Sequence, residues 1–158
     1  MALQAIKGAD TTATVLGRGA TAGLAGTVVM TAFQLLVEMP LTGREESYAP
    51  ANFASRVFGV EPKTAKRRRA LNYAAHFGIG AAWGATHGYV VHKGIRGQKA
   101  VFAVFAGIYT GDGLLNMSLG LYQPWNWSAQ DWATDLGEKL ILAEATGLIY
   151  ERLDPNPA

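Results

Sequence analysis

The stretch VFAVFAGIYTGDGLLNMSLGLY, residues 101–122, is apolar or small almost throughout, yet it contains Asp112 near its middle. A helix turns about 100° per residue, so Tyr109, Asp112 and Asn116 would share one polar stripe. An ionisable side chain in an apolar helix faces the neighbouring helices and by default indicates a functional site. Asp112 is therefore the first candidate functional residue. The alternative is an aspartate that only locks helices together.

Two histidines lie in a second glycine-rich stretch, ALNYAAHFGIGAAWGATHGYVV, residues 70–91. His76 and His87 are eleven residues apart, about three helical turns, so both are expected on one inward face. They would lie about 16 Å apart along the helix axis, too far to ligate one metal ion. His76 is the one expected at the same end of the helices as the acidic residues.

Three further carboxylates are expected at that end. Glu38 closes the first apolar segment, and Asp135 and Glu138 begin the last one. An imidazole beside buried carboxylates titrates in the mildly acidic range, as a proton relay or a pH-sensing site requires. The sequence therefore predicts one polar cluster that binds protons or a ligand, formed by Glu38, His76, Asp112, Asn116, Asp135 and Glu138.

Other chemistry is weaker in this sequence. Two carboxylates and one histidine suit iron, manganese or zinc, but the paired Glu-x-x-His motif of di-iron bundles is absent. Haem or another tetrapyrrole could use His76 or His87 with a ligand from another helix. No nucleophile and base arrangement, phosphate-binding glycine loop or HExxH pattern occurs. We therefore expect no enzymatic activity, no cofactor and no metal.

Composition and segment lengths favour a membrane protein. Of the 158 residues, 49% are hydrophobic and 16% are charged, and the mean hydropathy is +0.09. About 20 apolar residues cross the hydrocarbon core as a helix. Spans are expected at about 16–38, 70–91, 100–122 and 133–151, with Pro40 ending the first helix. The last span is charged, and we expect Asp135 and Lys139 to pair one turn apart near the membrane interface and its other acids to turn inward.

The connecting segments contain membrane-interface features. Pro50 and Gly59 bound a short helix in the first loop, which we expect to be interfacial, with Phe53 and Val57 in lipid. The basic tract KTAKRRR, residues 63–69, follows it. The loop YQPWNWSAQDW has the composition of an aromatic belt, so its tryptophans, Trp125, Trp127 and Trp132, are predicted interface anchors.

Glycines at four-residue spacing predict close helix contacts, because small residues let helix backbones approach each other. Such spacing occurs in all three glycine-rich segments. The predicted packing positions are Gly19, Gly23, Gly80, Gly84, Gly88, Gly107 and Gly111. The same faces are expected to make the protein oligomeric.

The motif EMPLTGR, residues 38–44, precedes a His-containing, Gly-rich segment, a short basic turn, a segment ending GLYQPW and an acidic final helix. In these features the chain resembles the YagU-like family of small bacterial inner-membrane proteins. Its first loop, TGREES, departs from a more proline-rich run in that family. The resemblance implies a four-helix inner-membrane protein with no established enzymatic activity and a suggested link to acid tolerance.

Together these patterns predict an all-α, polytopic four-helix membrane bundle, a single integral membrane domain over residues 1–158 with a short interfacial helix. The expected place is the bacterial inner membrane, and the expected partners are lipids and either further copies or a larger membrane complex. A net charge of only +2 speaks against nucleic acid, and the start around Lys7 against a removable signal peptide. Proton or solute handling is the first expected function. A non-catalytic accessory subunit and a haem-, pigment- or metal-binding protein are the alternatives.

Overall fold

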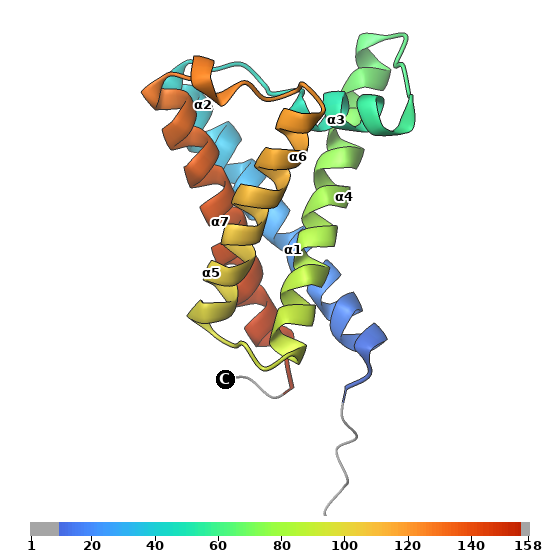
Figure 1. The fold of residues 1–158 in the computed structure, drawn as a ribbon, viewed down its shortest axis with the longest axis vertical. Helices are drawn as coiled ribbons and strands as arrows, with labels where there is room; N and C mark the ends of the chain where they lie inside the picture. Colours follow the sequence, from blue (N-terminus) through green and yellow to red (C-terminus); the bar gives the residue numbers. More distant parts are fainter. Residues whose placement is uncertain (1–9, 156–158) are drawn as a thin grey trace, which may run out of the picture.

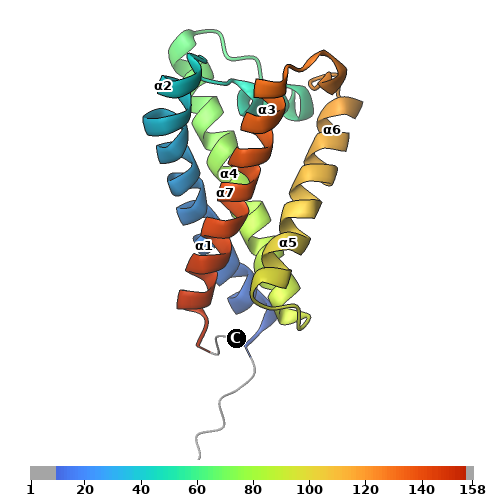
Figure 2. The same cartoon turned by 90° about the vertical axis from the view of Figure 1, so that its left-hand side faces the viewer.

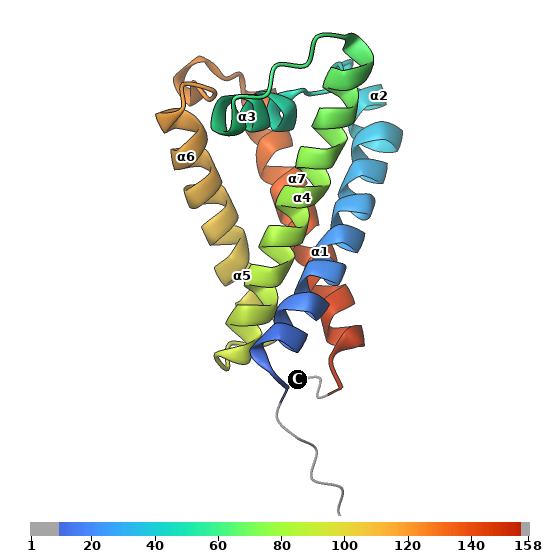
Figure 3. The same cartoon turned by 90° about the vertical axis from the view of Figure 1, so that its right-hand side faces the viewer.

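The computed structural model describes residues 10–155, and over that range the chain is all-helical, without strands. The predicted all-α class is confirmed. The long helices are α1 (Thr12–Phe33), α4 (Ala65–His92), α5 (Gln98–Gly107) continued by α6 (Gly113–Ser118), and α7 (Ala129–Leu153) (Figure 1). They lie close together where α1 begins and α7 ends, and α6 stands away from α4 at the other end (Figures 2 and 3). The expectation based on Lys7 lies outside the described residues.

The first helix does not end at Pro40 as predicted. A π-helical turn, Gln34–Glu38, follows α1 and leads into α2 (Met39–Thr42), which contains Pro40 in its first turn. The N–H of Met39 bonds to the carbonyl of Gln34, five residues back, so the helix is widened just before the proline. Proline lacks an N–H and crowds the preceding turn, and it is tolerated at the start of a helix. The helix therefore continues past Pro40. It ends at Gly43, whose φ of 68° is a left-handed conformation that glycine adopts easily.

The third segment ends earlier than the predicted residue 122. It comprises α5, a second π-helical turn at Ile108–Asp112, and α6, and then reverses at Gly120. The N–H groups of Leu121 and Tyr122 both bond to the carbonyl of Asn116, which closes the helix end. Tyr122 therefore leaves the helix axis and reaches the space between the helices.

Within the described residues, two helical segments are long and apolar enough to cross a membrane, Thr12–Thr42 and Gln98–Ser118. Their most apolar windows have mean hydropathies of 1.6 and 1.3. The predicted spans 70–91 and 133–151 lie inside α4 and α7. Thr64 caps α4 so that the helix starts at Ala65, and the arginines of the basic tract belong to its first turns.

The closest helix contact joins α1 to α4. A Cβ added at Gly23 would lie 2.2 Å from the carbonyl oxygen of Gly80 and 2.7 Å from the Cα of Gly84. One added at Gly19 would lie 2.3 Å from the Gly84 oxygen, and one at Gly88 would lie 2.5 Å from the Val15 oxygen. Backbone touches backbone along this line, so only glycine fits there.

Gly107 and Gly111 lie elsewhere than expected. A Cβ at either position would meet the ring of Trp83 at ordinary contact distances of 3.5 and 3.7 Å. These glycines therefore face a large side chain of α4 and not the backbone of another helix. The third segment accordingly sits further from α4 than α1 does.

The short helix predicted in the first loop is present as α3 (Ala49–Phe58), and it ends at Gly59 with φ of 65°. It lies across the end of the long helices (Figure 3). The side chain of Asn72 on α4 holds its start, accepting from the N–H of Ala51 at 3.1 Å and donating to the Ser47 carbonyl at 2.9 Å. Because α3 packs through its alanines, Phe53 turns towards the interior, contrary to our expectation, while Val57 is exposed.

A capping box formed by Ser128 and Asp131 fixes the start of α7, and its contribution to stability depends on pH. The Ser128 hydroxyl accepts from the N–H of Asp131 at 3.1 Å and donates to its carboxylate at 2.7 Å, and the Ser128 N–H donates to the same oxygen at 2.9 Å. These hydrogen bonds favour the charged form, so they hold the pKa of Asp131 below its ordinary value. The cap therefore contributes fully above that ordinary pKa, and its contribution is lost as the pH falls through the lowered one.

We expect Ser128→Ala to raise the pKa of Asp131 towards its ordinary value of about 3.9, since only the backbone N–H then remains as donor. Titration of the Asp131 carboxyl carbon by NMR measures this shift. Ser128→Thr keeps the hydroxyl and is the matched control. An unchanged pKa in the alanine variant would contradict the role of the hydroxyl.

Candidate functional site

A cavity of about 430 Å³ lies between the helices at the α3 end of the molecule. Its walls come from α1 and the π-helical turn after it, α3, α4, the third segment and α7. All six residues of the predicted polar cluster line it: Glu38, His76, Asp112, Asn116, Asp135 and Glu138. The cavity reaches the loops at that end, where the side chains of Arg44 and Asp131 are 36% and 38% exposed.

Lys139 of α7 is the central cation of one half of the cavity. Its ammonium group pairs with Asp135 one turn earlier on the same helix, as the sequence predicted, and it lies 3.9 Å from the carboxylate of Asp112 on the third segment. The same group lies 5.5 Å from the ring centre of Tyr122 and 6.0 Å from that of Tyr109. Two carboxylates and two aromatic rings therefore surround one buried ammonium.

Asp112 ends the π-helical turn of the third segment and is held by its own helix. Asn116 donates to both the carbonyl and the carboxylate of Asp112, at 2.9 and 3.0 Å. The polar stripe expected from their spacing thus exists, and Asp112 faces the interior. Glu38 likewise ends a π-helical turn. Such turns are frequent at functional sites because they redirect side chains out of the regular helical register.

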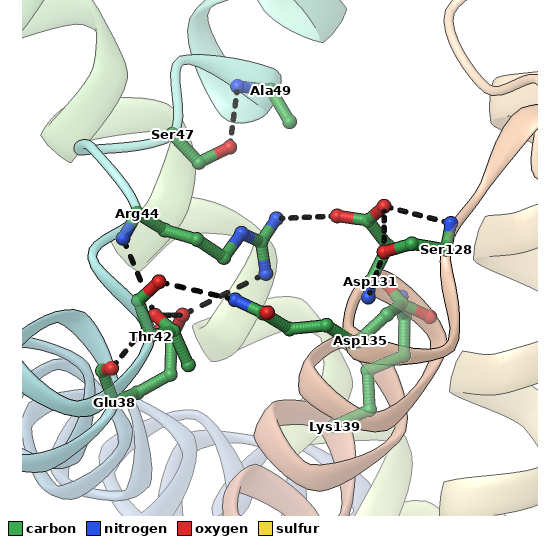
Figure 4. A network of polar contacts seen from close by, with 10 residues as sticks. Glu38, Thr42, Arg44, Ser47, Ala49, Ser128, Asp131, Asp135 and Lys139 are labelled. Atoms are coloured by element: carbon green, nitrogen blue, oxygen red, sulfur yellow. Dashed lines mark hydrogen bonds and ion pairs between the residues drawn. The ribbon is translucent and has the colours of Figure 1, made fainter.

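Glu38 and Glu138 form the acidic part of the other half of the cavity. The carboxyl of Glu138 lies beside that of Glu38 and beside the amide of Gln34. Arg44 lies between α2 and α7, 3.6 Å from Glu38 and 3.7 Å from Asp131 (Figure 4). One guanidinium group therefore faces two carboxyls, and it connects the first loop to the start of the last helix.

The two histidines have different surroundings. His76 lines the cavity, but its Nε2 lies 3.1 Å from the Thr31 hydroxyl, and within residues 10–155 it shows no ion pair with a carboxylate. The expected contact between His76 and the carboxylates is therefore not seen. His87 is buried away from this cavity, with its ring 5.3 Å from that of Tyr150, and its Nδ1 atom has no hydrogen-bond partner among residues 10–155.

The tryptophans of the third loop divide into two groups. Trp127 lines the cavity and stacks edge to face with Tyr122 and Trp132, at centroid distances of 5.3 and 5.0 Å. Trp125 is 72% exposed. Trp83 of α4 also lines the cavity. The walls of the site are therefore aromatic as well as acidic.

The lining has a large excess of negative charge. Among the described lining residues seven carry carboxyl groups, whereas two, Arg44 and Lys139, carry permanent positive charge. Within the same part of the chain no three His, Asp or Glu side chains are gathered closely enough to hold a metal ion. The carboxyls are distributed along the walls of the cavity, and carboxylates in a poorly solvated space need positive charge to neutralise them. The site is therefore suited to hold protons or cations.

Five further residues of the site lie outside the predicted cluster: Thr31, Gln34, Arg44, Tyr122 and Lys139. For Lys139 the signal was available, since a lysine four residues after Asp135 within an apolar helix must face the interior. The others become neighbours through contacts between distant segments. Comparison with protein-family models, curated proteins and solved structures finds no match, so the resemblance to the YagU-like family stays a prediction.

Proposed function

We propose that this chain is an integral membrane protein with four membrane-crossing segments, whose charged cavity takes up and releases protons. The distribution of side chains supports the membrane part. Only 28% of the most apolar window of Thr12–Thr42, and likewise of Gln98–Ser118, is buried. Large apolar side chains instead point outward, among them Leu36, which is 76% exposed. Apolar surfaces of this extent are rare on proteins surrounded by water.

The buried faces of the helices support the same proposal. In α1 the buried positions are mainly glycine, alanine and threonine, which suits helices that associate in lipid by close packing. In α7 the charged residues Asp135, Glu138 and Lys139 turn into the cavity, while Leu136 and Leu148 are exposed. A charged helix can cross a membrane when its charges face the interior. We assign residues 70–91 of α4 and 133–151 of α7 as the two additional segments and, from the resemblance, the bacterial inner membrane as the location.

The observation that carries the proton part is the crowding of carboxyls around too few cations. Glu138 lies next to Glu38, and Asp112 shares the single ammonium of Lys139 with Asp135. Neighbouring carboxyls in a poorly solvated space share protons, because two like charges cannot both ionise freely. The charged groups that face this space are Glu38, Arg44, Glu45, Glu46, Asp112, Asp131, Asp135, Glu138 and Lys139, together with His76. A cavity of about 430 Å³ with a polar lining has room for the water that proton exchange needs.

The test is proton flux through reconstituted protein. Purified wild-type chain in liposomes with a trapped pH-sensitive dye is expected to move protons when a potassium diffusion potential is imposed. Glu138→Gln removes a proton acceptor and leaves the described ion pairs of Arg44 and Lys139 in place, and we expect it to slow the flux at least about tenfold. Glu144→Gln is the matched control, since it makes the same change on the same helix, where Glu144 contacts Gln98 outside the cavity.

The flux of the control should equal that of the wild type. Wild-type liposomes that move protons no faster than empty liposomes would contradict the proposed function. Equal proton flux in Glu138→Gln and wild type would show that the Glu138 carboxyl takes no part in proton movement.

A further inference from the structure

We infer that the cavity binds a small organic cation, an alkyl- or arylammonium compound. The inference rests on the proposed function, because it takes the cavity to be open to the medium and its carboxyls to release protons. Proton uptake alone does not require a ligand of this kind, so the organic cation is a separate substrate class.

The charge of the lining determines the sign of the ligand. Among the described residues, seven lining carboxyl groups face Arg44 and Lys139 of the lining, and Arg69 pairs with Glu46 at 3.6 Å from outside it, so four negative charges are left to neutralise when the carboxyls are ionised. Protons supply part of this neutralisation. A ligand that replaces protons there must itself be positive, since an anion would add to the repulsion. Glu45 and Glu46 line the cavity near α3, where they raise the local concentration of cations.

The placement of the carboxyls favours an organic cation over a metal ion. They are distributed along the walls, and no three of the described acidic or histidine side chains meet at one point. Metal ions need several oxygen ligands at about 2.0 to 2.6 Å. An ammonium or guanidinium compound instead makes separate contacts with carboxyls and rings over a larger volume.

Lys139 shows what kind of group this cavity holds. Its alkylammonium head lies between Asp112 and Asp135, within 6.0 Å of the ring centres of Tyr109 and Tyr122. Aromatic faces and carboxyls are the combination that proteins use to recognise ammonium groups. The chain therefore already contains a bound alkylammonium, supplied by its own side chain.

The other half of the cavity has the same combination, with one permanent cation, Arg44, and more carboxyls. The guanidinium of Arg44 faces Glu38 and Asp131 and acts on Glu138 from further away. The rings of Phe53, Tyr73 and Trp83 belong to the lining as well. The volume of about 430 Å³ falls within the range of about 300 to 1,000 Å³ that is usual for small-molecule sites. This half is where we place the ligand, with Glu138 as its main counter-charge.

Equilibrium dialysis of the purified full-length chain in a neutral detergent tests the inference with phenyltrimethylammonium as the probe. This cation has no N–H groups, so its binding reports charge and ring contacts. Benzenesulfonate, an anion of similar size, is the matched probe. We expect saturable binding of the cation only, at least about tenfold weaker in Glu138→Gln, and unchanged in Glu144→Gln. Glu138→Asp, which keeps the charge, should retain most of the affinity.

The outcomes test cation binding and proton flux separately. No saturable binding, equal binding of benzenesulfonate, or equal affinity in wild type and Glu138→Gln would overturn the inference. If such a protein still moves protons in liposomes, the proposed function stands without it. If phenyltrimethylammonium binds as expected but no proton flux occurs, the cavity is a cation site and the proton function is wrong.

Discussion

Replacing Gly23 with alanine is expected to destabilise the protein by about 3 kcal/mol, at the upper end of the range for overpacked interiors. The added methyl group would lie 2.2 Å from the Gly80 oxygen and 2.7 Å from the Gly84 Cα. Both are backbone atoms of α4, so no side chain can rotate away, and the two helices must separate. Their separation would also open the wall of the cavity formed by Thr27 and Gly80. The measurement is unfolding of the purified variant by heat or by SDS in mixed micelles.

Gly78→Ala is the control for this prediction. Gly78 lies in α4 two residues before Gly80, and a Cβ there would meet nothing within 4 Å. Alanine favours helix over glycine by about 1 kcal/mol, so this variant should be as stable as the wild type or more stable. Equal stability of Gly23→Ala and Gly78→Ala would show that α1 and α4 do not touch as described.

Replacing Lys139 with methionine is expected to cost about 3 to 5 kcal/mol, as for other buried ion pairs that lose one partner. Lys139 is 9% exposed, and its ammonium group is shared by the carboxylates of Asp112 and Asp135. Methionine fills a similar volume but leaves two carboxylates facing each other without a counter-charge. The variant should therefore unfold at a lower SDS fraction than the wild type.

The triple variant Lys139→Met, Asp112→Asn, Asp135→Asn separates the charge effect from the loss of packing. Removing all three charges should recover most of the stability, because replacing a buried ion pair by neutral groups is often tolerated. Asn116 can still hydrogen-bond to the side chain at position 112. If the triple variant is as unstable as Lys139→Met alone, the charges do not account for the loss and the ammonium is not held between the two carboxylates.

Helix limits and contacts within one helix were largely predictable from the sequence. Pro50 and Gly59 bound α3, and Asp135 pairs with Lys139 as their spacing requires. Asn116 reaches Asp112 in the same way. Such features depend on residues about four positions apart, and the geometry of any α-helix brings those side chains together. Two limits were wrong, at Pro40 and at residue 122. Each of those segments contains a π-helical turn, which residue preferences do not predict.

The sequence by itself determined that this chain is helical and that the glycine-rich faces of α1 and α4 are buried, because composition and spacing express both properties locally. Only the tertiary structure decided what each face meets. Gly23 and Gly107 belong to similar small-residue patterns, yet one touches a backbone and the other the ring of Trp83. His76 meets Thr31, and Lys139 reaches Asp112 on another segment. The partner of a buried face depends on how surfaces far apart in the chain fit together, and spacing along one helix contains no information about that fit.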